Sequence, residues 1–190
     1  MKKCFFLLAV VILTSACAFS PQVVVPTPTV DCPDAMVGKG HTVTLNVLDE
    51  RVNSVLGTRS VQGTGAEISC GGDLAAIVEG AISDGLRRQG FAVIDQSSVN
   101  SLELRVEIRS LSYKITRGFW MGGLRVECFL KAVCLDGKSW GYENVYRGES
   151  TANVGRVPSA AENEEYINKA ISNAINLLLQ DQKMLKALAA

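Results

Sequence analysis

Histidine and paired cysteines are the features that this 190-residue sequence lacks most plainly. His41 is the only histidine, and no two cysteines have the C-x-x-C spacing. A zinc site needs several such ligands close together, so the spacing argues against a metal. A Ser-His-Asp hydrolase would have to take its base from His41, next to the proposed linker, which argues against that chemistry. We therefore expect no catalytic residues and no metal.

Long apolar runs and surplus positive charge are also missing. No segment after the N-terminal leader approaches the roughly 20 apolar residues of a membrane-spanning helix. Basic and acidic residues both number 19, and removal of the leader leaves 17 basic against 19 acidic residues. Because no basic stripe remains to follow a phosphate backbone, nucleic acid is not an expected partner.

The first 16 residues have the pattern of a secretory signal peptide. A basic start precedes an apolar stretch, Cys4–Leu13, and small residues follow at positions 14–16. Two cleavages compete. Ordinary signal peptidase would cut after Ala18 and release a soluble periplasmic protein that begins at Phe19. Alternatively, Leu13-Thr14-Ser15-Ala16-Cys17 resembles a bacterial lipobox, which would make Cys17 the acylated first residue of the mature chain.

We favour acylation of Cys17, because chance seldom places a cysteine between an apolar leader and a tether-like segment. A diacylglycerol plus an amide-linked chain would anchor the protein firmly, since one chain alone holds only marginally. Residue 18 is alanine rather than aspartate. By resemblance to lipoprotein sorting in Gram-negative bacteria, this predicts the outer membrane, with the domain facing the periplasm. The covalent lipid is the only non-protein group expected.

Residues 17–40 are expected to form a lipid-anchored, proline-rich linker. They contain four of the five prolines, and such sequence acts as a semi-rigid spacer that would hold a domain off the bilayer. The alternative is an edge strand, because Val23–Val25 could pair with the domain before Pro26 interrupts the strand.

Residues 41–190 are expected to form one domain, large enough to bury a core without metals or many disulfides. Four cysteines lie outside the leader and the lipobox: Cys32, Cys70, Cys128 and Cys134. An oxidising envelope permits disulfides among them. Cys128 and Cys134 would lie about 20 Å apart on one strand, too far to bridge each other. One disulfide and buried free thiols remain open alternatives.

Apolar spacing predicts the strands. Alternation over Thr42–Val47, Leu102–Ile115 and Leu124–Cys134 is typical of half-buried strands. A change of apolar phase near Arg109–Ser110 predicts a β-bulge. Asp136-Gly137 predicts a turn into a last strand that ends near Ser150, which completes an antiparallel meander.

A period of 3.6 residues predicts two helices. The first begins after Asp73 and ends at Gly90, a candidate left-handed cap. The second follows Ser159 and Glu162, which match a capping box. The order β-α-β-β-β-α predicts an α+β fold, a two-layer sandwich in which two helices cover one face of a mostly antiparallel sheet.

The connection Gly118–Gly123 is unusual because a turn between strands normally carries polar residues. It contains Phe119, Trp120 and Met121. These side chains either fold back over the sheet or project, and projecting aromatic residues would contact a protein partner or the bilayer interface.

The stretch Val43-Thr44-Leu45-Asn46-Val47-Leu48-Asp49-Glu50-Arg51, followed by Leu56-Gly57, resembles the YajG-type bacterial lipoproteins. The shared pattern is a strand, Asp-x-Arg, Leu-Gly, and then a helix that closes in a Gly-aromatic pair such as Gly90-Phe91. The resemblance covers residues 42–185 and implies an envelope lipoprotein with a small α+β domain. It implies no reaction and no catalytic residues. Asp49 and Arg51 are expected to form an ion pair at the end of the strand.

Taken together, the sequence predicts a lipid-anchored cell-envelope protein whose domain binds an unidentified envelope protein or component and is not an enzyme. The first alternative is an auxiliary lipoprotein subunit of an envelope complex that transports lipid or lipopolysaccharide. An apolar groove between the helices and the sheet would favour that alternative.

Overall fold

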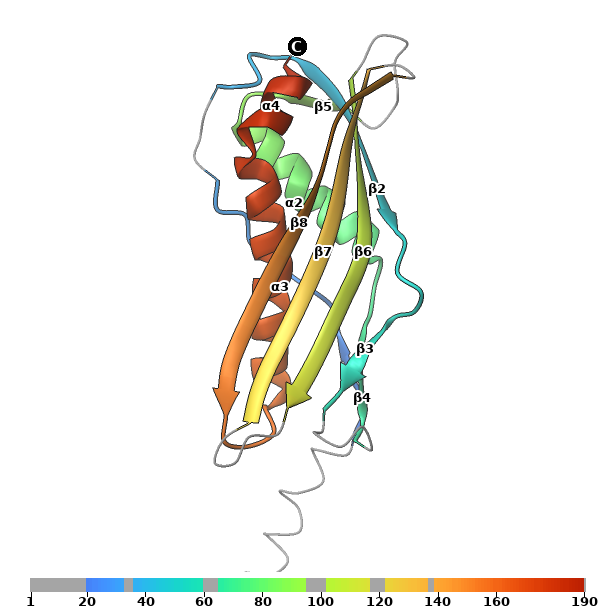
Figure 1. Ribbon diagram of the computed structural model, residues 1–190, viewed down its shortest axis with the longest axis vertical. Coiled ribbons are helices and arrows are strands. Elements are labelled where there is room, and N and C mark those ends of the chain that lie inside the picture. The colour runs from blue at the N-terminus through green and yellow to red at the C-terminus, as the bar shows by residue number, and fades with distance from the viewer. Residues whose placement is uncertain are drawn as a thin grey trace, which may run out of the picture.

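Two β-sheets and three helices make up the described part of the chain, which in this computed structural model comprises residues 20–32, 36–59, 65–94, 102–116, 122–136 and 139–189. The helices lie against one face of the larger sheet and leave the other face open (Figure 1). The predicted α+β class is confirmed.

The larger sheet has the strand order β5-β2-β6-β7-β8. Its long strands β6 (Leu102–Thr116), β7 (Gly122–Asp136) and β8 (Ser139–Val154) form the predicted antiparallel meander. The predicted bulge is also present, because the register of β6 against β7 shifts between Ile108 and Ser110. Strand β2 (Thr42–Asp49) pairs in parallel with both β6 and β5 (Ala92–Ile94), so this sheet is mixed.

A second, smaller sheet has the order β1-β4-β3 and was not predicted. Strand β1 (Gln22–Val24) pairs in parallel with β4 (Glu67–Cys70), and β4 is antiparallel to β3 (Val55–Thr58). Strand β3 lies against the end of β6, where only a glycine fits: a Cβ atom on Gly57 would lie 2.0 Å from the carbonyl oxygen of Tyr113. The Leu-Gly step of the sequence pattern is therefore a point of close backbone approach.

The helices begin and end as the sequence predicts. The side chain of Asp73 caps α2 (Leu74–Arg88) by accepting from the N–H of Ala76, and Gly90 has a φ of 84°. Helix α3 (Ala160–Gln180) begins with the predicted capping box of Ser159 and Glu162. A third helix, α4 (Gln182–Leu188), follows α3 and was not predicted.

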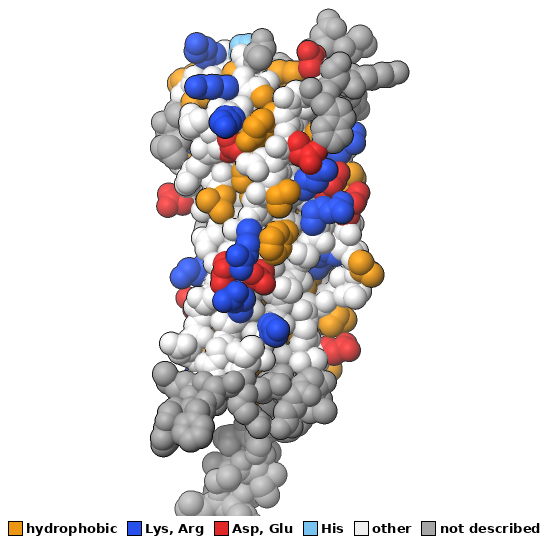
Figure 2. Space-filling model, viewed as in Figure 1, with side chains coloured by type: hydrophobic (Ala, Val, Ile, Leu, Met, Phe, Trp, Pro, Cys, Tyr) orange, Lys and Arg blue, Asp and Glu red, His pale blue; other side chains and the backbone are white. Residues whose placement is uncertain are grey.

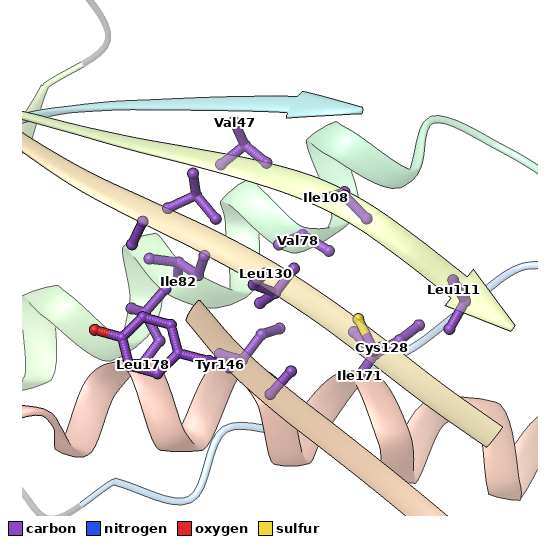
Figure 3. Packing of buried hydrophobic residues seen from close by; sticks show 14 of the residues in the cluster. Val47, Val78, Ile82, Ile108, Leu111, Cys128, Leu130, Tyr146, Ile171 and Leu178 are labelled. Atoms are coloured by element: carbon purple, nitrogen blue, oxygen red, sulfur yellow. The ribbon is translucent and has the colours of Figure 1, made fainter. Parts of the chain in front are cut away.

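The core lies between the larger sheet and the helices (Figure 3). The bulge in β6 returns the later apolar residues of that strand to the core side, where Leu111 and Ile115 join Ile108. Helix α3 packs very closely on β8, because a Cβ atom on Gly148 would lie 2.0 Å from the carbonyl oxygen of Ala170. The helix layer therefore rests directly on the sheet at this point, as expected of a close-packed interior.

Candidate functional site

The residues predicted to mediate function fall into two groups. Cys17, Phe119, Trp120 and Met121 lie outside the described residues. The four remaining cysteines, Cys32, Cys70, Cys128 and Cys134, are described, and each is a buried free thiol. The sequence left open either one disulfide or buried free thiols, and the structure has buried free thiols.

Burial makes these thiols poor nucleophiles. It raises the pKa of both Cys128 and Cys134 to about 12. The pKa of Cys70 is also raised by burial, although Arg51 acts in the opposite direction. Because the thiolate is the reactive form, none of these three is suited to attack a substrate near neutral pH.

The acidic side chains on the outer face of the sheet are held in ion pairs. Glu143 pairs with Lys131 at 3.1 Å, while Glu127 and Glu149 both pair with Arg147. Carboxylates held in this way are not arranged as a general acid and base around a cleft. Among the residues that the structure describes, no group of three or more histidine, cysteine or acidic side chains is placed to hold a metal ion.

Gly137-Lys138-Ser139-Trp140-Gly141 matches the Gly-x-Ser-x-Gly pattern of a hydrolase nucleophile elbow. An elbow joins a strand to a helix, whereas Ser139 is the first residue of β8, directly after β7 in the meander. His41 precedes β2, which is separated from β8 by β6 and β7, about 14 Å at the usual strand spacing. This serine and the only histidine therefore do not form a catalytic pair.

Asp181 is the centre of a dense cluster of hydrogen bonds between β8 and the helices. Its Oδ2 accepts from the hydroxyls of Tyr142 and Tyr146, both at 2.8 Å, and from Asn144 at 3.0 Å. Its Oδ1 accepts from the first N–H groups of α4. Partial burial acts in the opposite direction, but these hydrogen bonds hold the pKa of the Asp181 carboxyl well below its usual range. The cluster fixes the junction of α3 and α4 on β8 and is structural.

The proline-rich segment lies along α3 instead of extending away from the domain. The N–H groups of Thr27, Thr29 and Asp31 donate to Asn168 Oδ1, Ser172 Oγ and Asn176 Oδ1 at 2.8, 2.9 and 2.9 Å. Two residues of extended chain and four residues of helix both advance about 6 Å, so the spacing of the N–H donors matches the spacing of the acceptors along α3. Pro26 and Pro28, which lack an N–H, occupy the alternate positions. We call this arrangement the α3 ladder.

The edge-strand alternative is thus the correct one for Gln22–Val24, and residues 20–32 belong to the packed domain. The spacer interpretation of this part of the linker is wrong. The segment stays on the domain because Val24 is fully buried and because the N–H groups of Thr27, Thr29 and Asp31 donate to side chains of α3.

A buried polar chain joins the N-terminal strand to the helix and the sheet. The Tyr113 hydroxyl donates to Asn163 Oδ1 at 2.7 Å, and Asn163 Nδ2 donates to Gln22 Oε1 at 2.8 Å. Gln22 then donates to the carbonyl oxygen of Ala160 at 2.9 Å. Burial raises the pKa of Tyr113 and so keeps its hydroxyl protonated as a donor. These contacts place the N-terminal strand beside the start of α3 and the end of β6. Ser20, whose carbonyl oxygen accepts from Arg59, lies at this end of the domain. We call this the N-terminal end of the domain.

The expected ion pair between Asp49 and Arg51 is confirmed and is bidentate. Arg51 Nε and Nη2 donate to the two carboxylate oxygens at 2.8 and 2.7 Å. The Arg51 side chain is only 9% exposed, so water and salt screen this ion pair less than a fully exposed one. It fixes the chain where β2 leaves the larger sheet toward β3. The Asp-x-Arg pattern thus has a structural role.

The outer face of the larger sheet carries a hollow of about 600 Å³ near the N-terminal end. Its lining comes from the last residues of β6, the first residues of β7 and the end of β8: Lys114, Thr116, Gly123, Leu124, Arg125, Glu127, Thr151, Ala152 and Asn153. Basic and acidic side chains are spread over both halves of this view of the molecule (Figure 2). Most of the lining is polar, so the hollow suits a charged or hydrogen-bonding ligand better than an acyl chain.

No described helix is long and apolar enough to cross a membrane. The fold is that of a two-layer α+β domain whose N-terminal segment is fastened along one helix. The chain belongs to the family described as "Uncharacterized lipoprotein", whose model matches residues 28–189. Membership associates it with the cell envelope, as the sequence predicted.

Solved structures from two bacteria share the fold. A Xanthomonas campestris protein aligns with a TM-score of 0.54 at 13% identity, covering 88% of this chain and 95% of that one. A minor lipoprotein from Acinetobacter baumannii aligns with a TM-score of 0.53 at 9% identity, covering 75% of this chain and 90% of that one. At these identities the likeness concerns the fold alone. No curated protein matches the chain.

Proposed function

We propose that this protein is a non-enzymatic binding domain, anchored by an acylated Cys17 to the outer membrane and facing the periplasm. The docking of residues 20–32 on the domain carries the proposal, because it leaves only the short segment from Cys17 to Ser20 between lipid and domain. Three residues of extended chain span at most about 11 Å. The N-terminal end would therefore lie close to the bilayer surface.

The chemistry of the described side chains supports a binding role over catalysis. Cys70, Cys128 and Cys134 have raised pKa values. The carboxylates of Glu127, Glu149 and Asp181 are engaged by basic or hydrogen-bonding partners. A catalytic site would instead present groups with pKa values shifted toward neutrality around a cleft.

The alternative function, a subunit of an envelope complex that transports lipid or lipopolysaccharide, would need an apolar groove between helices and sheet. The contact of Gly148 with α3 closes that interface along β8. The hollow on the outer face has a largely polar lining. These two observations favour the binding role.

The test of anchoring is the intact mass of the protein extracted from its native envelope. We expect a chain that begins at Cys17 and carries three acyl chains. A lipid-free chain that begins at Phe19 would overturn the proposal. A Cys17→Ser variant, expressed in parallel, is the control, since it should lose both the lipid and the membrane fraction.

The test of binding is cross-linking in the envelope. Phe119 and Trp120 are proposed to contact the partner, so replacing both by serine should remove at least one cross-linked envelope protein. A Phe129→Ser variant, altered on the outer sheet face, is the matched control. An unchanged set of partners in the double variant would refute this contact.

A further inference from the structure

The strand register places two cations directly opposite each other on the open face of the sheet. Lys114 on β6 is the cross-strand partner of Arg125 on β7, and Thr151 on β8 continues the row. Like charges in directly opposite positions destabilise a sheet. Positions where a sequence departs from such a rule of sheet stability without an evident stabilising gain are expected to be functional or strained.

The acidic side chains near this row compensate only part of its charge. Arg125 contacts Glu149 at 3.3 Å, but Glu149 also pairs with Arg147 at 3.0 Å, and Arg147 pairs with Glu127. Lys114 makes no ion pair with any other residue that the structure describes. Three basic and two acidic side chains thus leave one positive charge over, on the side of the N-terminal end.

A hollow adjoins this surplus charge because the next row has a gap in its middle. That row contains Thr116, Gly123 and Asn153, and the glycine contributes no side chain. A Cβ atom at Gly123 would lie 2.9 Å from the Thr116 hydroxyl oxygen. The resulting space of about 600 Å³ falls within the range of small-ligand sites, about 300–1,000 Å³. Lysine, arginine, threonine and asparagine side chains are together suited to a phosphate group.

The hollow also lies at the end of the domain that the anchor would bring to the membrane. Lys114 follows Tyr113 on β6, and Tyr113 is linked through Asn163 to Gln22 of the N-terminal strand. The N-terminal segment on the core face of β6 and the cationic row on its outer face therefore lie at the same position along the strand.

We propose that this hollow binds the phosphate of an anionic phospholipid headgroup in the leaflet that holds the acylated cysteine. The proposal rests on the proposed anchoring. Lys114 supplies the unpaired charge, Arg125 shares its guanidinium between Glu149 and the phosphate, and Thr151 and Asn153 provide hydrogen bonds. Headgroup binding would orient the domain on the bilayer, which a flexible lipid anchor alone does not do.

The experiment measures how fast each lysine amine is modified by reductive methylation, read by peptide mass spectrometry on the full chain extracted from its envelope. The chain is compared in neutral detergent, on vesicles of phosphatidylglycerol and phosphatidylethanolamine, and in detergent with inorganic phosphate. We expect Lys114 to react about fivefold more slowly on the vesicles, the effect of one basic residue at an anionic surface. Lys131 lies six residues further along the sheet, about 20 Å from the Arg125 row and beyond the screening length, so its rate should not change.

An Arg125→Gln variant separates phosphate binding from simple shielding by the bilayer. It should lose most of the protection of Lys114, whereas Arg105→Gln, a change of the same charge near the far end of β6, should keep it. Equal protection in the Arg125→Gln variant, protection of Lys131 as well, or no protection of Lys114 would each overturn the headgroup site. Equal protection by inorganic phosphate alone would overturn the lipid as the source of the phosphate. The intact mass of the same sample reports the anchor separately, so loss of one proposal is distinguishable from loss of the other.

Discussion

Replacement of Ser172 by alanine tests the α3 ladder most directly. The Ser172 hydroxyl accepts from the N–H of Thr29 at 2.9 Å, and the residue is only 7% exposed. Alanine removes the acceptor and leaves the Thr29 donor without a partner at a partly buried position. The substitution adds no bulk, so the packing of α3 on the sheet should be unchanged.

The expected magnitude follows from the two effects of this change. A hydrogen bond contributes about 0.5–1.5 kcal/mol net, and an unsatisfied buried donor costs about 1–3 kcal/mol. At a partly buried position we expect about 1 kcal/mol of local destabilisation, which corresponds to about fivefold faster amide exchange. Alanine has a higher helix propensity than serine by up to about 0.7 kcal/mol, so global stability should change little.

The assay is residue-resolved amide hydrogen exchange on the full chain. The Thr29 amide should exchange faster in Ser172→Ala, while Asn168→Ala should act first on the Thr27 amide. Lys169→Ala, an exposed position on the same helix, is the control and should change neither. If the Thr29 amide exchanges equally fast in the wild type and in Ser172→Ala, the α3 ladder does not hold the segment from Thr27 to Asp31 on the helix.

Three further substitutions test the structure elsewhere. Gly57→Ala should destabilise the fold by about 1–3 kcal/mol in urea unfolding, because its Cβ would press on the Tyr113 carbonyl, whereas Gly80→Ala, an open position in α2, should stabilise it by about 0.5–1 kcal/mol. Equal effects would refute the close approach. Tyr113→Phe should cost about 1–3 kcal/mol in the same assay, because it leaves the buried Asn163 carbonyl oxygen without its donor. Asp181 has a folded-state pKa below its unfolded value of about 3.9, so its stabilising contribution is present above that pH and is lost as the pH falls. The thermal midpoint of Asp181→Asn should therefore lie below that of the wild type at pH 7, and the difference should begin to shrink only as the pH falls below about 3.9. A difference that stays constant down to about pH 2 would contradict this assignment.

The elements that the sequence predicted are those whose signals are local. Asp73, Ser159 and Glu162 cap helices through residues three or four positions away, and each cap is present. The bulge near Ser110 follows from a change of apolar phase within one strand. The small sheet has no such signal, because its strands are three or four residues long and pair with distant segments.

The docked N-terminal segment and the hollow depend on partners that the sequence does not bring together. Asn168, Ser172 and Asn176 fall on a polar stripe of α3, which by pattern alone indicates a solvated surface. Their spacing of four residues, set against prolines at alternate positions, was the available signal. The facing pair of Lys114 and Arg125 depends on the register of β6 and β7, and a bulge earlier in β6 shifts that register by one residue. No composition or spacing rule gives that alignment.

Under the proposed acylation of Cys17, the position of the N-terminal segment decides how far the domain would reach from the membrane. If residues 17–40 were a free extended spacer, they would span up to about 80 Å, and a partner could lie far from the leaflet of the anchor. Because residues 20–32 return along α3, the free length between Cys17 and Ser20 is at most about 11 Å. If Cys17 is acylated as proposed, a tether this short would keep the N-terminal end, with its cationic row, near the headgroups. A partner that contacts this end of the domain must therefore itself approach the bilayer surface, so the search for partners belongs among membrane-associated components of the envelope.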